Sequence, residues 1–516
     1  MIKRLASYAD ITRYPRRRVG LISAVYAAFL LAQSVLLGAT AGPLIAAGDL
    51  TLRHDIELLA DAGVITGPIS TWPLAWGPIL QDVRSANTSG LTLSALHALG
   101  RVRERAQWET RSNELLLSAR TAVAVNPTRI RSFQYTPRGE GEVSLAAAAT
   151  FSWAALDLNL QYVGGDGDSQ RVRFDDSYAA LVLGNWSLGL STQQRWWGPA
   201  WDGSLILSNS ARPFPAITID RVFTDPFDVR WLRWIGPWDL SVMFGQLESD
   251  RDVSNPLFFA ARATFRPHRT LEIGISRSAM WCGDGRPCSA GTFVDLLLGQ
   301  DNVGDEGINE DNEPGNQLGG FDVRWTPPVL GRSVSLYGQF IGEDEAGGLP
   351  SQYLGQVGAE WSGTVAERWS TRLFGEYSRT SCDFFGASDF FANGGFNCAY
   401  NSGVFPTGYR FRGRSIGHGA DNDADLITVG AILVNKEQTR WQAHVRSGQL
   451  NANGPPDSRN TLTPTPQDLL SVDVSHSRRF RYGTFEIGAG IDFIDDEVSG
   501  ETTQEGRFFL HFRTGF

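Results

Sequence analysis

Three arginines alternate with other residues in one short segment: Arg410, Arg412 and Arg414. On an extended segment, residues spaced by two face the same side, so we expect these guanidinium groups to form a cationic strip, with His418 beyond it. Guanidinium groups bind carboxylates and phosphates through paired hydrogen bonds, so the strip is a candidate site for an anionic ligand. The alternative is structural, because three aspartates between residues 421 and 425 can pair with the arginines inside the fold.

A second segment combines aromatic and charged side chains: Arg195, Trp196, Trp197, Trp201 and Asp202. Aromatic faces stack on the apolar C–H face of pyranose rings while charged neighbours bind hydroxyls, so the segment is a candidate sugar site. Tryptophan also anchors proteins at membrane interfaces. Adjacent residues of a strand point to opposite faces, so at most one of Trp196 and Trp197 can face lipid.

The elements that carry these segments are strands, because apolar and polar residues alternate from residue 114 onward. In the last residues, Phe508, Leu510 and Phe512 lie on one face, Arg507 and His511 lie on the other, and the chain ends on an aromatic residue. This pattern is typical of the closing strand of a bacterial outer-membrane β-barrel. A half-buried strand of a soluble β-sandwich fits the alternation alone equally well.

Eighteen alternating runs are predicted, at 114–125, 142–151, 153–163, 172–184, 186–195, 215–224, 237–248, 257–266, 270–281, 319–326, 333–342, 353–363, 370–380, 426–436, 439–449, 467–479, 482–495 and 506–516. Bacterial barrels have an even number of strands. We therefore expect residues 113–516 to form an all-β transmembrane barrel of about 18 antiparallel strands. The long connections at 282–318 and 381–425 are expected to be surface loops.

Residues 1–41 have the pattern of a secretory signal peptide, because basic residues precede an uncharged stretch at 19–37 and small residues follow it. The uncharged stretch is also long enough for an inner-membrane anchor. Residues 42–112 have helical periodicity, with Thr51 and Thr92 as candidate N-caps. We expect this part to be a periplasmic α-helical bundle that plugs the barrel.

The four cysteines form two pairs that are close in sequence: Cys282 with Cys288, and Cys382 with Cys398. Neither pair has the C-x-x-C spacing of a zinc or redox site. In an oxidising compartment two local disulfides are expected, and free buried thiols are the alternative.

Four segments, 52–65, 71–77, 194–209 and 409–418, resemble the Wzi-like capsule-assembly proteins, and the similarity runs through the whole predicted mature chain. The resemblance implies an eighteen-stranded outer-membrane barrel with a periplasmic helical bundle. It also implies a lectin, not an enzyme, that holds capsular polysaccharide on the cell surface. It does not settle which sugar is bound.

We therefore expect a bacterial outer-membrane protein that binds capsular or related extracellular polysaccharide and attaches it to the cell surface. The expected partners are an anionic polysaccharide, outer-membrane lipid and the barrel insertion machinery, and the expected state is a monomer. The net charge of −10 argues against a nucleic-acid partner. The main alternative is a porin or substrate-specific channel, since eighteen strands can enclose an aqueous pore.

The seven histidines are scattered singly and the sequence contains no H-E-x-x-H motif, so we expect no catalytic residues, metal or cofactor. The absence of such a motif leaves open a hydrolase whose catalytic residues come from different strands. The acidic run between residues 301 and 313 lacks the ligand spacing of a calcium loop, which favours a solvated surface loop.

Overall fold

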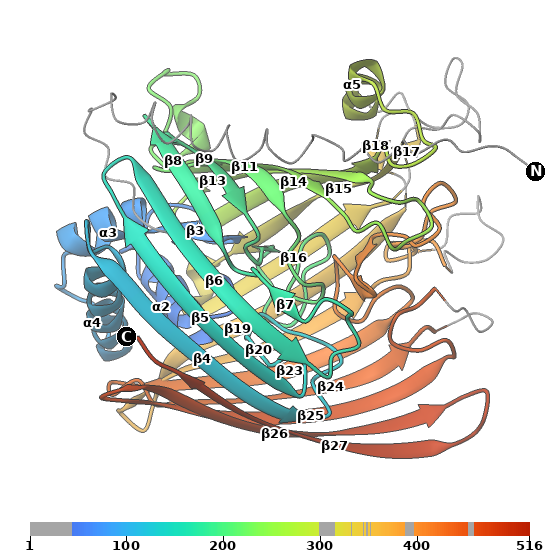
Figure 1. Ribbon diagram of the computed structural model, residues 1–516. Helices are drawn as coiled ribbons and strands as arrows, with labels where there is room; N and C mark the ends of the chain where they lie inside the picture. The colour runs from blue at the N-terminus through green and yellow to red at the C-terminus, as the bar shows by residue number, and fades with distance from the viewer. Residues whose placement is uncertain are drawn as a thin grey trace, which may run out of the picture. The chain divides into compact units, whose positions relative to one another are not determined.

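Long antiparallel strands close into a barrel in the computed structural model (Figure 1). The structure describes residues 44–298, 315–331, 333–343, 345–346, 349–350, 352–386, 397–452 and 459–515. The predicted signal peptide, the acidic run and the terminal Phe516 lie outside these described residues.

The barrel strands are β4 (Leu115–Val125), β5 (Gly141–Thr150), β6 (Ala154–Gly164), β7 (Val172–Arg173), β8 (Tyr178–Leu183), β9 (Trp186–Ser191), β11 (Ala216–Arg221), β12 (Trp238–Gln246), β13 (Leu257–His268), β14 (Leu271–Trp281), β15 (Gly315–Trp325), β16 (Val334–Gly342), β19 (Tyr353–Val365), β20 (Trp369–Arg379), β23 (Asp425–Asn435), β24 (Arg440–Leu450), β25 (Gln467–Phe480), β26 (Gly483–Asp496) and β27 (Thr502–Arg513). The short strand β7 and strand β8 pair with β6 at different residues, so together they occupy one position. The described residues therefore form a closed barrel of eighteen strand positions, and this prediction is confirmed.

The last strand closes the barrel by pairing with the first, from Phe508 opposite Val125 to Arg513 opposite Arg120. On β4, Ala122 and Ala124 are buried while the alternating Val123 and Val125 are exposed. On β27, Phe508 is exposed, and Arg507 points inward to pair with Asp473 of β25. The wall thus has an apolar outer face and a polar inner face, as a membrane barrel requires.

The two ends of the barrel differ in the length of their connections. At the end where β4 begins, most strands are joined by two to four residues, as at 151–153, 184–185, 366–368 and 436–439. We call this the turn end. The opposite end, the loop end, carries the long connections 126–140, 192–215, 282–314 and 380–424. Both long loops expected from the sequence lie here, and the first is shorter than predicted because β15 begins at Gly315.

From residue 44 onward, where the described residues begin, three helices precede the barrel strands: α2 (Leu50–Asp61), α3 (Trp76–Ser85) and α4 (Leu93–Glu109). The N-cap of α2 is Asp49, whose side chain accepts from Leu52 N (3.0 Å), so the prediction of Thr51 was wrong. Thr92 caps α4 as predicted. Helix α3 was not predicted as a separate helix. It begins just before Pro78, and proline is tolerated in a first helical turn because N–H groups there have no intrahelical partner.

Helix α2 lies inside the barrel at the turn end, behind the wall of β4 to β6 in Figure 1. Its Asp61 accepts from the inward-facing Arg324 of β15 (2.8 Å), and the imidazole of His54 hydrogen-bonds Ser370 of β20 (2.7 Å). Helix α4 packs against α2 through Arg101, which pairs with Asp55 (2.6 Å). In the described part of the chain, no helix combines the length and apolar character needed to cross a membrane.

Smaller elements complete the fold: β1 (Leu44–Ile45), β2 (Thr71–Trp72), β3 (Leu74–Ala75), β10 (Trp196–Trp197), β17 (Glu345–Ala346), β18 (Leu349–Pro350), β21 (Arg410–Phe411), β22 (Arg414–Ser415), α5 (Ala290–Leu298), η2 (Arg233–Ile235) and η3 (Pro328–Leu330). Strand β10 pairs with β2, so a loop-end connection meets the helical part inside the lumen. Apolar side chains fill the lumen on both sides of this pairing.

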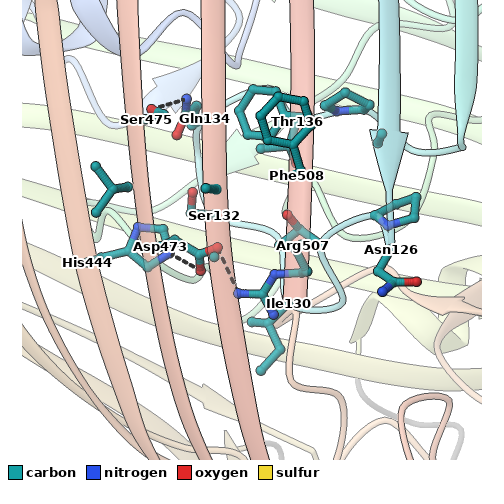
Figure 2. Close-up of a pocket in the computed structure, with 18 of the residues that line it drawn as sticks. Asn126, Ile130, Ser132, Gln134, Thr136, His444, Asp473, Ser475, Arg507 and Phe508 are labelled. Carbon is teal, nitrogen blue, oxygen red and sulfur yellow. Dashed lines mark hydrogen bonds and ion pairs between the residues drawn. The ribbon is translucent and has the colours of Figure 1, made fainter. Parts of the chain in front are cut away.

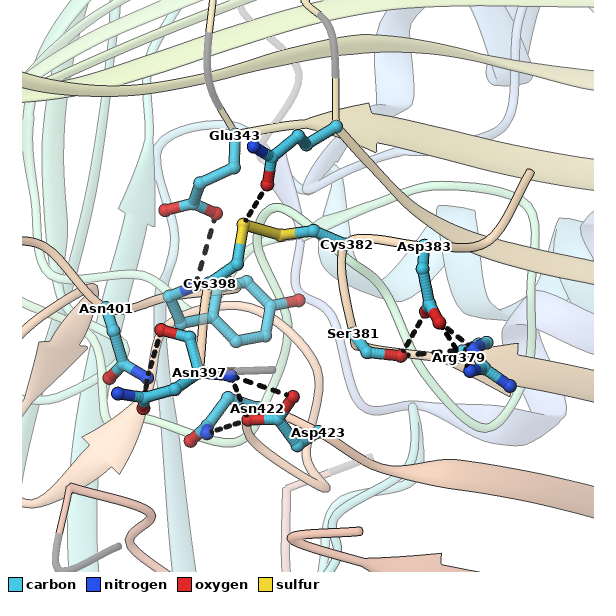
Figure 3. The surroundings of a disulfide bond; sticks show 12 residues. Glu343, Arg379, Ser381, Cys382, Asp383, Asn397, Cys398, Asn401, Asn422 and Asp423 are labelled. Carbon is cyan, nitrogen blue, oxygen red and sulfur yellow. Dashed lines mark hydrogen bonds and ion pairs between the residues drawn. A yellow bond between two sulfur atoms is a disulfide. The ribbon is translucent and has the colours of Figure 1, made fainter. Parts of the chain in front are cut away.

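Both predicted disulfides, Cys282–Cys288 and Cys382–Cys398, are confirmed. Figure 3 shows the second one, at the base of the 380–424 loop. Beside it, the backbone N–H of Asn397 donates to Asp423 (2.9 Å), and Arg379 pairs with Asp383 (2.7 Å). The disulfide therefore belongs to a network that fixes where this loop leaves the barrel.

Candidate functional site

The tryptophan segment lies in the centre of the lumen. Trp196, Trp197 and Trp201 are all buried, because β10 is covered by α2 and by the 126–140 connection. The indole N–H of Trp201 donates to Glu360 (2.7 Å), and that of Trp196 donates to the carbonyl of Ala200 (3.1 Å). The three indole rings are therefore closed off from solvent, and sugar binding by this segment stays a prediction. The sequence patterns of exposed and lumenal tryptophans are the same, so burial was not predictable from residue type.

Arg53 of α2 joins three parts of the chain at this point. Its guanidinium group lies 4.1 Å from the ring centre of Trp201 and 4.5 Å from that of Phe133. It also pairs with Glu57 (2.7 Å) and donates to the carbonyl of Pro199 (2.7 Å). Cation–π contacts strengthen when the cation is desolvated, so this buried arginine stabilises the helix against both loop-end connections.

Asp202 and Arg195, the charged residues of the same segment, are also lumenal. Arg446 of β24 donates to both oxygens of Asp202 (2.6 and 2.8 Å), which also accepts from Thr428 (2.8 Å). Burial alone raises the pKa of Asp202, but Arg446 overcomes it and lowers that pKa to about 2. Arg195 is also buried, and its guanidinium group donates to the hydroxyl of Ser241 (3.3 Å). These charges therefore hold the wall and its contents together.

Asp202 and Arg446 are one of a set of close contacts between inward-facing charges, which we call the lumenal ion pairs. The set is Arg53–Glu57, Arg262–Asp322, Arg324–Asp61, Arg372–Glu360, Arg446–Asp202 and Arg507–Asp473, with distances of 2.5 to 2.8 Å. Each arginine of the set has a carboxylate partner.

The segment with the three alternating arginines is not extended. It forms a tight hairpin in which Arg410 is opposite Ser415 and Phe411 is opposite Arg414, with positive φ at Arg412 (50°) and Gly413 (72°). The prediction of a straight strip was therefore wrong. Arg410 is buried and pairs with Asp421 through two hydrogen bonds (2.7 and 3.0 Å), which is the structural alternative considered above.

Arg414 instead joins arginines of the 126–140 connection to form what we call the arginine cluster: Arg129, Arg131, Arg138 and Arg414. Their guanidinium groups donate to backbone carbonyls, for example Arg414 to Arg129 (3.1 Å), Arg129 to Leu462 (2.7 Å) and Arg131 to Pro137 (2.7 Å). Arg138 donates to the carbonyls of Asn209 and Ser210 (3.0 and 2.9 Å). Among the residues that the structure describes, none of the four forms a salt bridge with a carboxylate.

The cluster carries mutual repulsion. Burial, followed by the guanidinium groups of Arg138 and Arg414, lowers the pKa of Arg131 to about 9. Burial also lowers the pKa of Arg414, and the nearby guanidinium groups of Arg138 and Arg129 lower it further. Arg412 lies at the turn of the hairpin, is partly exposed, and is 3.8 Å from Asp168. The cluster was missed from the sequence, although three arginines in one connection between predicted strands are a visible signal.

His418 is buried against the 192–215 connection. Its Nδ1 accepts from the backbone N–H of Ala420 (3.1 Å), and a Cβ added at Gly203 would lie 2.0 Å from its Nε2. Burial lowers the pKa of His418 to about 4, so the imidazole is neutral at pH 7. It therefore packs two loops together and does not reach the surface.

Two of the cavities along the inner wall share Gln134 as a lining residue. The smaller, about 30 Å³, separates the 126–140 connection from β24 to β27 and is shown in Figure 2. There Asp473 accepts from Arg507 (2.7 Å) and pairs with His444 (3.0 Å). The larger, about 300 Å³, lies between the helices and the wall. Gln134 lines both and donates to Ser475 (3.1 Å) and to Glu486, so its side chain stands between them.

Comparison with known proteins agrees with this architecture. Residues 119–498 match the family described as Capsule assembly protein Wzi. A Klebsiella pneumoniae relative, described as an uncharacterized 55.8 kDa protein in the cps region, is 34% identical over 327 residues. That match spans 62% of this chain and 63% of the relative, which is less than two thirds of the relative's length.

The fold is similar to that of Wzi from Escherichia coli, described as an outer membrane protein involved in group 1 capsule assembly and as a carbohydrate binding β-barrel. The TM-score is 0.78 at 24% identity, and the alignment covers 92% of this chain and 99% of that one. The matched family and the closed barrel place the protein in the bacterial outer membrane. The chain belongs to the Wzi family of capsule assembly proteins.

Proposed function

We propose that the protein binds capsular or related extracellular polysaccharide at the outer face of the membrane and holds it on the cell surface. The observation that carries this proposal is the arginine cluster at the loop end of the barrel. Short turns of outer-membrane barrels face the periplasm and long loops face outward, so the cluster belongs to the external side. The carbohydrate binding described for E. coli Wzi supports the same class of ligand.

The polymer is proposed to be anionic. Like charges destabilise one another, and a polyanion at the same place reverses the sign of that interaction. Arg129, Arg412 and Arg414 are partly exposed and are the proposed contacts. Each exposed contact contributes only about 0.5–1 kcal/mol, so attachment depends on several contacts to one chain. Arg410, His418 and the tryptophan segment are proposed to position the loops that carry these contacts.

The helical part, residues 42–112, is proposed to be a periplasmic plug for the barrel of residues 113–516. The contacts of α2 with inward-facing strand residues support this role. A plugged lumen favours a surface-binding protein over a porin, and binding over catalysis. Function as a monomer, and insertion by the barrel insertion machinery, remain part of the proposal.

The test is the distribution of polysaccharide between cells and medium. Cells with the triple variant Arg129→Gln, Arg412→Gln and Arg414→Gln should release polymer while the barrel reaches the outer membrane at its normal level. The matched control replaces three exposed arginines at the turn end, Arg230, Arg233 and Arg481, with glutamine. It removes the same charge and should leave the polymer on the cells. A triple variant that assembles and keeps its polymer would exclude Arg129, Arg412 and Arg414 as the attachment site.

The porin alternative has its own measurement. The purified barrel in a planar bilayer should show no stable conductance, because the lumen is filled on both sides of the β2–β10 pairing. Discrete channel openings would favour the porin if their ion selectivity changes in the triple variant.

A further inference from the structure

Helix α5 lies outside the barrel. By the alternation along β12, β13 and β14, Phe244, Phe259 and Trp281 point away from the lumen, whereas their neighbours Met243, Phe258 and Met280 belong to the lumenal core. Phe293 of α5 packs on these outward rings, with centroid distances of 4.7 Å to Trp281 and 5.5 Å to Phe259. In Figure 1 the helix stands on the outer side of the wall formed by β14 and β15.

Both ends of α5 are fixed to the barrel. Before the helix, the Cys282–Cys288 disulfide closes the connection from β14, and Ser289 accepts from the backbone N–H of Thr292 (3.1 Å). After it, the outward-facing Arg277 of β14 donates to the carbonyls of Leu296 and Leu297 (2.7 and 2.9 Å). A cation at a helix C-terminus satisfies carbonyls that lack intrahelical partners. The helix therefore has a defined seat at the loop-end rim.

The face of α5 that points away from the barrel is apolar. Val294, Leu297 and Leu298 are 50%, 36% and 63% exposed, while Leu296 is fully buried against the wall. Asp295 is the only charged residue of the helix. Further along β14, the outward-facing Ile275 is 54% exposed on the surface that meets acyl chains. The apolar face of α5 is thus continuous with the lipid-facing surface of the barrel.

We infer that α5 is an interfacial membrane helix that inserts Val294, Leu297 and Leu298 among the acyl chains of the outer leaflet. A short helix with an apolar face and a polar end lies in the interfacial plane of a membrane, and burying the three side chains in lipid removes their apolar surface from water. Outer-leaflet lipid is the one proposed occupant of this face, because the neighbouring wall already contacts it.

The test uses the full-length protein in intact outer membranes, with the photoreactive residue p-benzoylphenylalanine in place of Val294 or Leu298. Ile275 is the lipid-facing reference position, and Asp250, exposed in the β12–β13 connection at the same end, is the aqueous reference. After irradiation, lipid adducts at 294 and 298 should be within about threefold of those at 275, as expected for a helix in the interface. Assembly of each variant is checked by its heat-dependent mobility on gels.

Adduct levels at 294 and 298 that match those at 250 would overturn the inference. Adducts to a second copy of the chain, in place of lipid, would overturn it as well. The outcome is independent of polysaccharide attachment, because lipid adducts are measured in membranes of cells that make no polymer.

Discussion

The lumenal ion pairs and the arginine cluster at the loop end use arginine in opposite ways. In the lumen, Arg262, Arg372 and Arg446 each lie within 2.6 Å of a carboxylate oxygen. At the loop end, Arg129 and Arg414 donate to backbone carbonyls and have other arginines as neighbours. Arginine with a carboxylate partner holds the barrel to its contents, whereas arginine without one is available to an anion from outside. The presence of a partner therefore distinguishes the two roles better than residue type or spacing does.

The largest expected effect comes from breaking a lumenal ion pair. Asp202→Asn leaves Arg446 buried without its main partner, and such a change costs about 3–5 kcal/mol. The assembled barrel should therefore unfold at a lower denaturant concentration or fail to accumulate. Arg414→Gln is the matched control and should change the unfolding free energy little. Equal destabilisation by the two variants would remove the distinction between the regions.

A smaller effect is expected on ligand binding. Purified protein with Arg129→Gln, Arg412→Gln and Arg414→Gln should bind an anionic polysaccharide with a free energy weaker by about 1.5–3 kcal/mol, or roughly tenfold to a hundredfold in Kd. Binding by the unmodified protein should weaken as salt increases, since exposed charges are screened. A triple variant with the same salt dependence as the parent would show that other charges bind the polymer.

The third effect depends on pH. His418 has a folded pKa of about 4, below the ordinary value of 6.5, so between these values the unfolded chain binds a proton that the folded chain does not. Stability therefore falls as the pH is lowered from 6.5 toward 4, by about 1–2 kcal/mol at pH 5. His418→Gln should flatten this part of the stability curve. Asp202 does not contribute in this window, because its stabilisation is lost only below pH 4.

The smallest effect on the barrel is expected from removal of the Cys382–Cys398 disulfide. Cys382→Ser with Cys398→Ser should leave global unfolding unchanged, because the hydrogen bonds that close the barrel do not involve this loop. Protease cleavage within 380–424 should become faster, since local opening is controlled separately from global unfolding. A large drop in global stability would show that the loop belongs to the same cooperative unit as the wall.

The barrel was predictable from the sequence because a wall with lipid on one side and charged contents on the other enforces a period of two. The same period of two predicted the two faces of the closing strand, on which Phe508 points outward and Arg507 points inward. Helix α3 was missed because Trp76 to Pro78 has the composition of a turn. The two-residue strands in the lumen were missed because pairs such as Trp72 with Trp196 depend on tertiary contact and not on periodicity.

The candidate site was only partly predictable. Arg412 and Arg414 were identified, but the neighbours that define their environment, Arg129 and Arg138, lie far away in sequence. The tryptophan segment was assigned to sugar binding because aromatic and charged residues are as frequent in a filled lumen as in a sugar site. Its burial follows from the pairing of β10 with β2, which no local pattern indicates.

The pairing of β2 with β10 also determines an order of events during biogenesis. β2 precedes every barrel strand in the chain, yet the wall is completed only when β27, the last strand, meets β4. Were the wall to close around an empty interior, Arg324 and Arg372 would lose the carboxylates that α2 supplies, Asp61 and Glu57. We therefore expect the N-terminal part to be in place when the final seam forms. In this order the wall forms around the N-terminal part. In a chain released before the N-terminal part is in place, we expect β4 and β27 to remain unpaired.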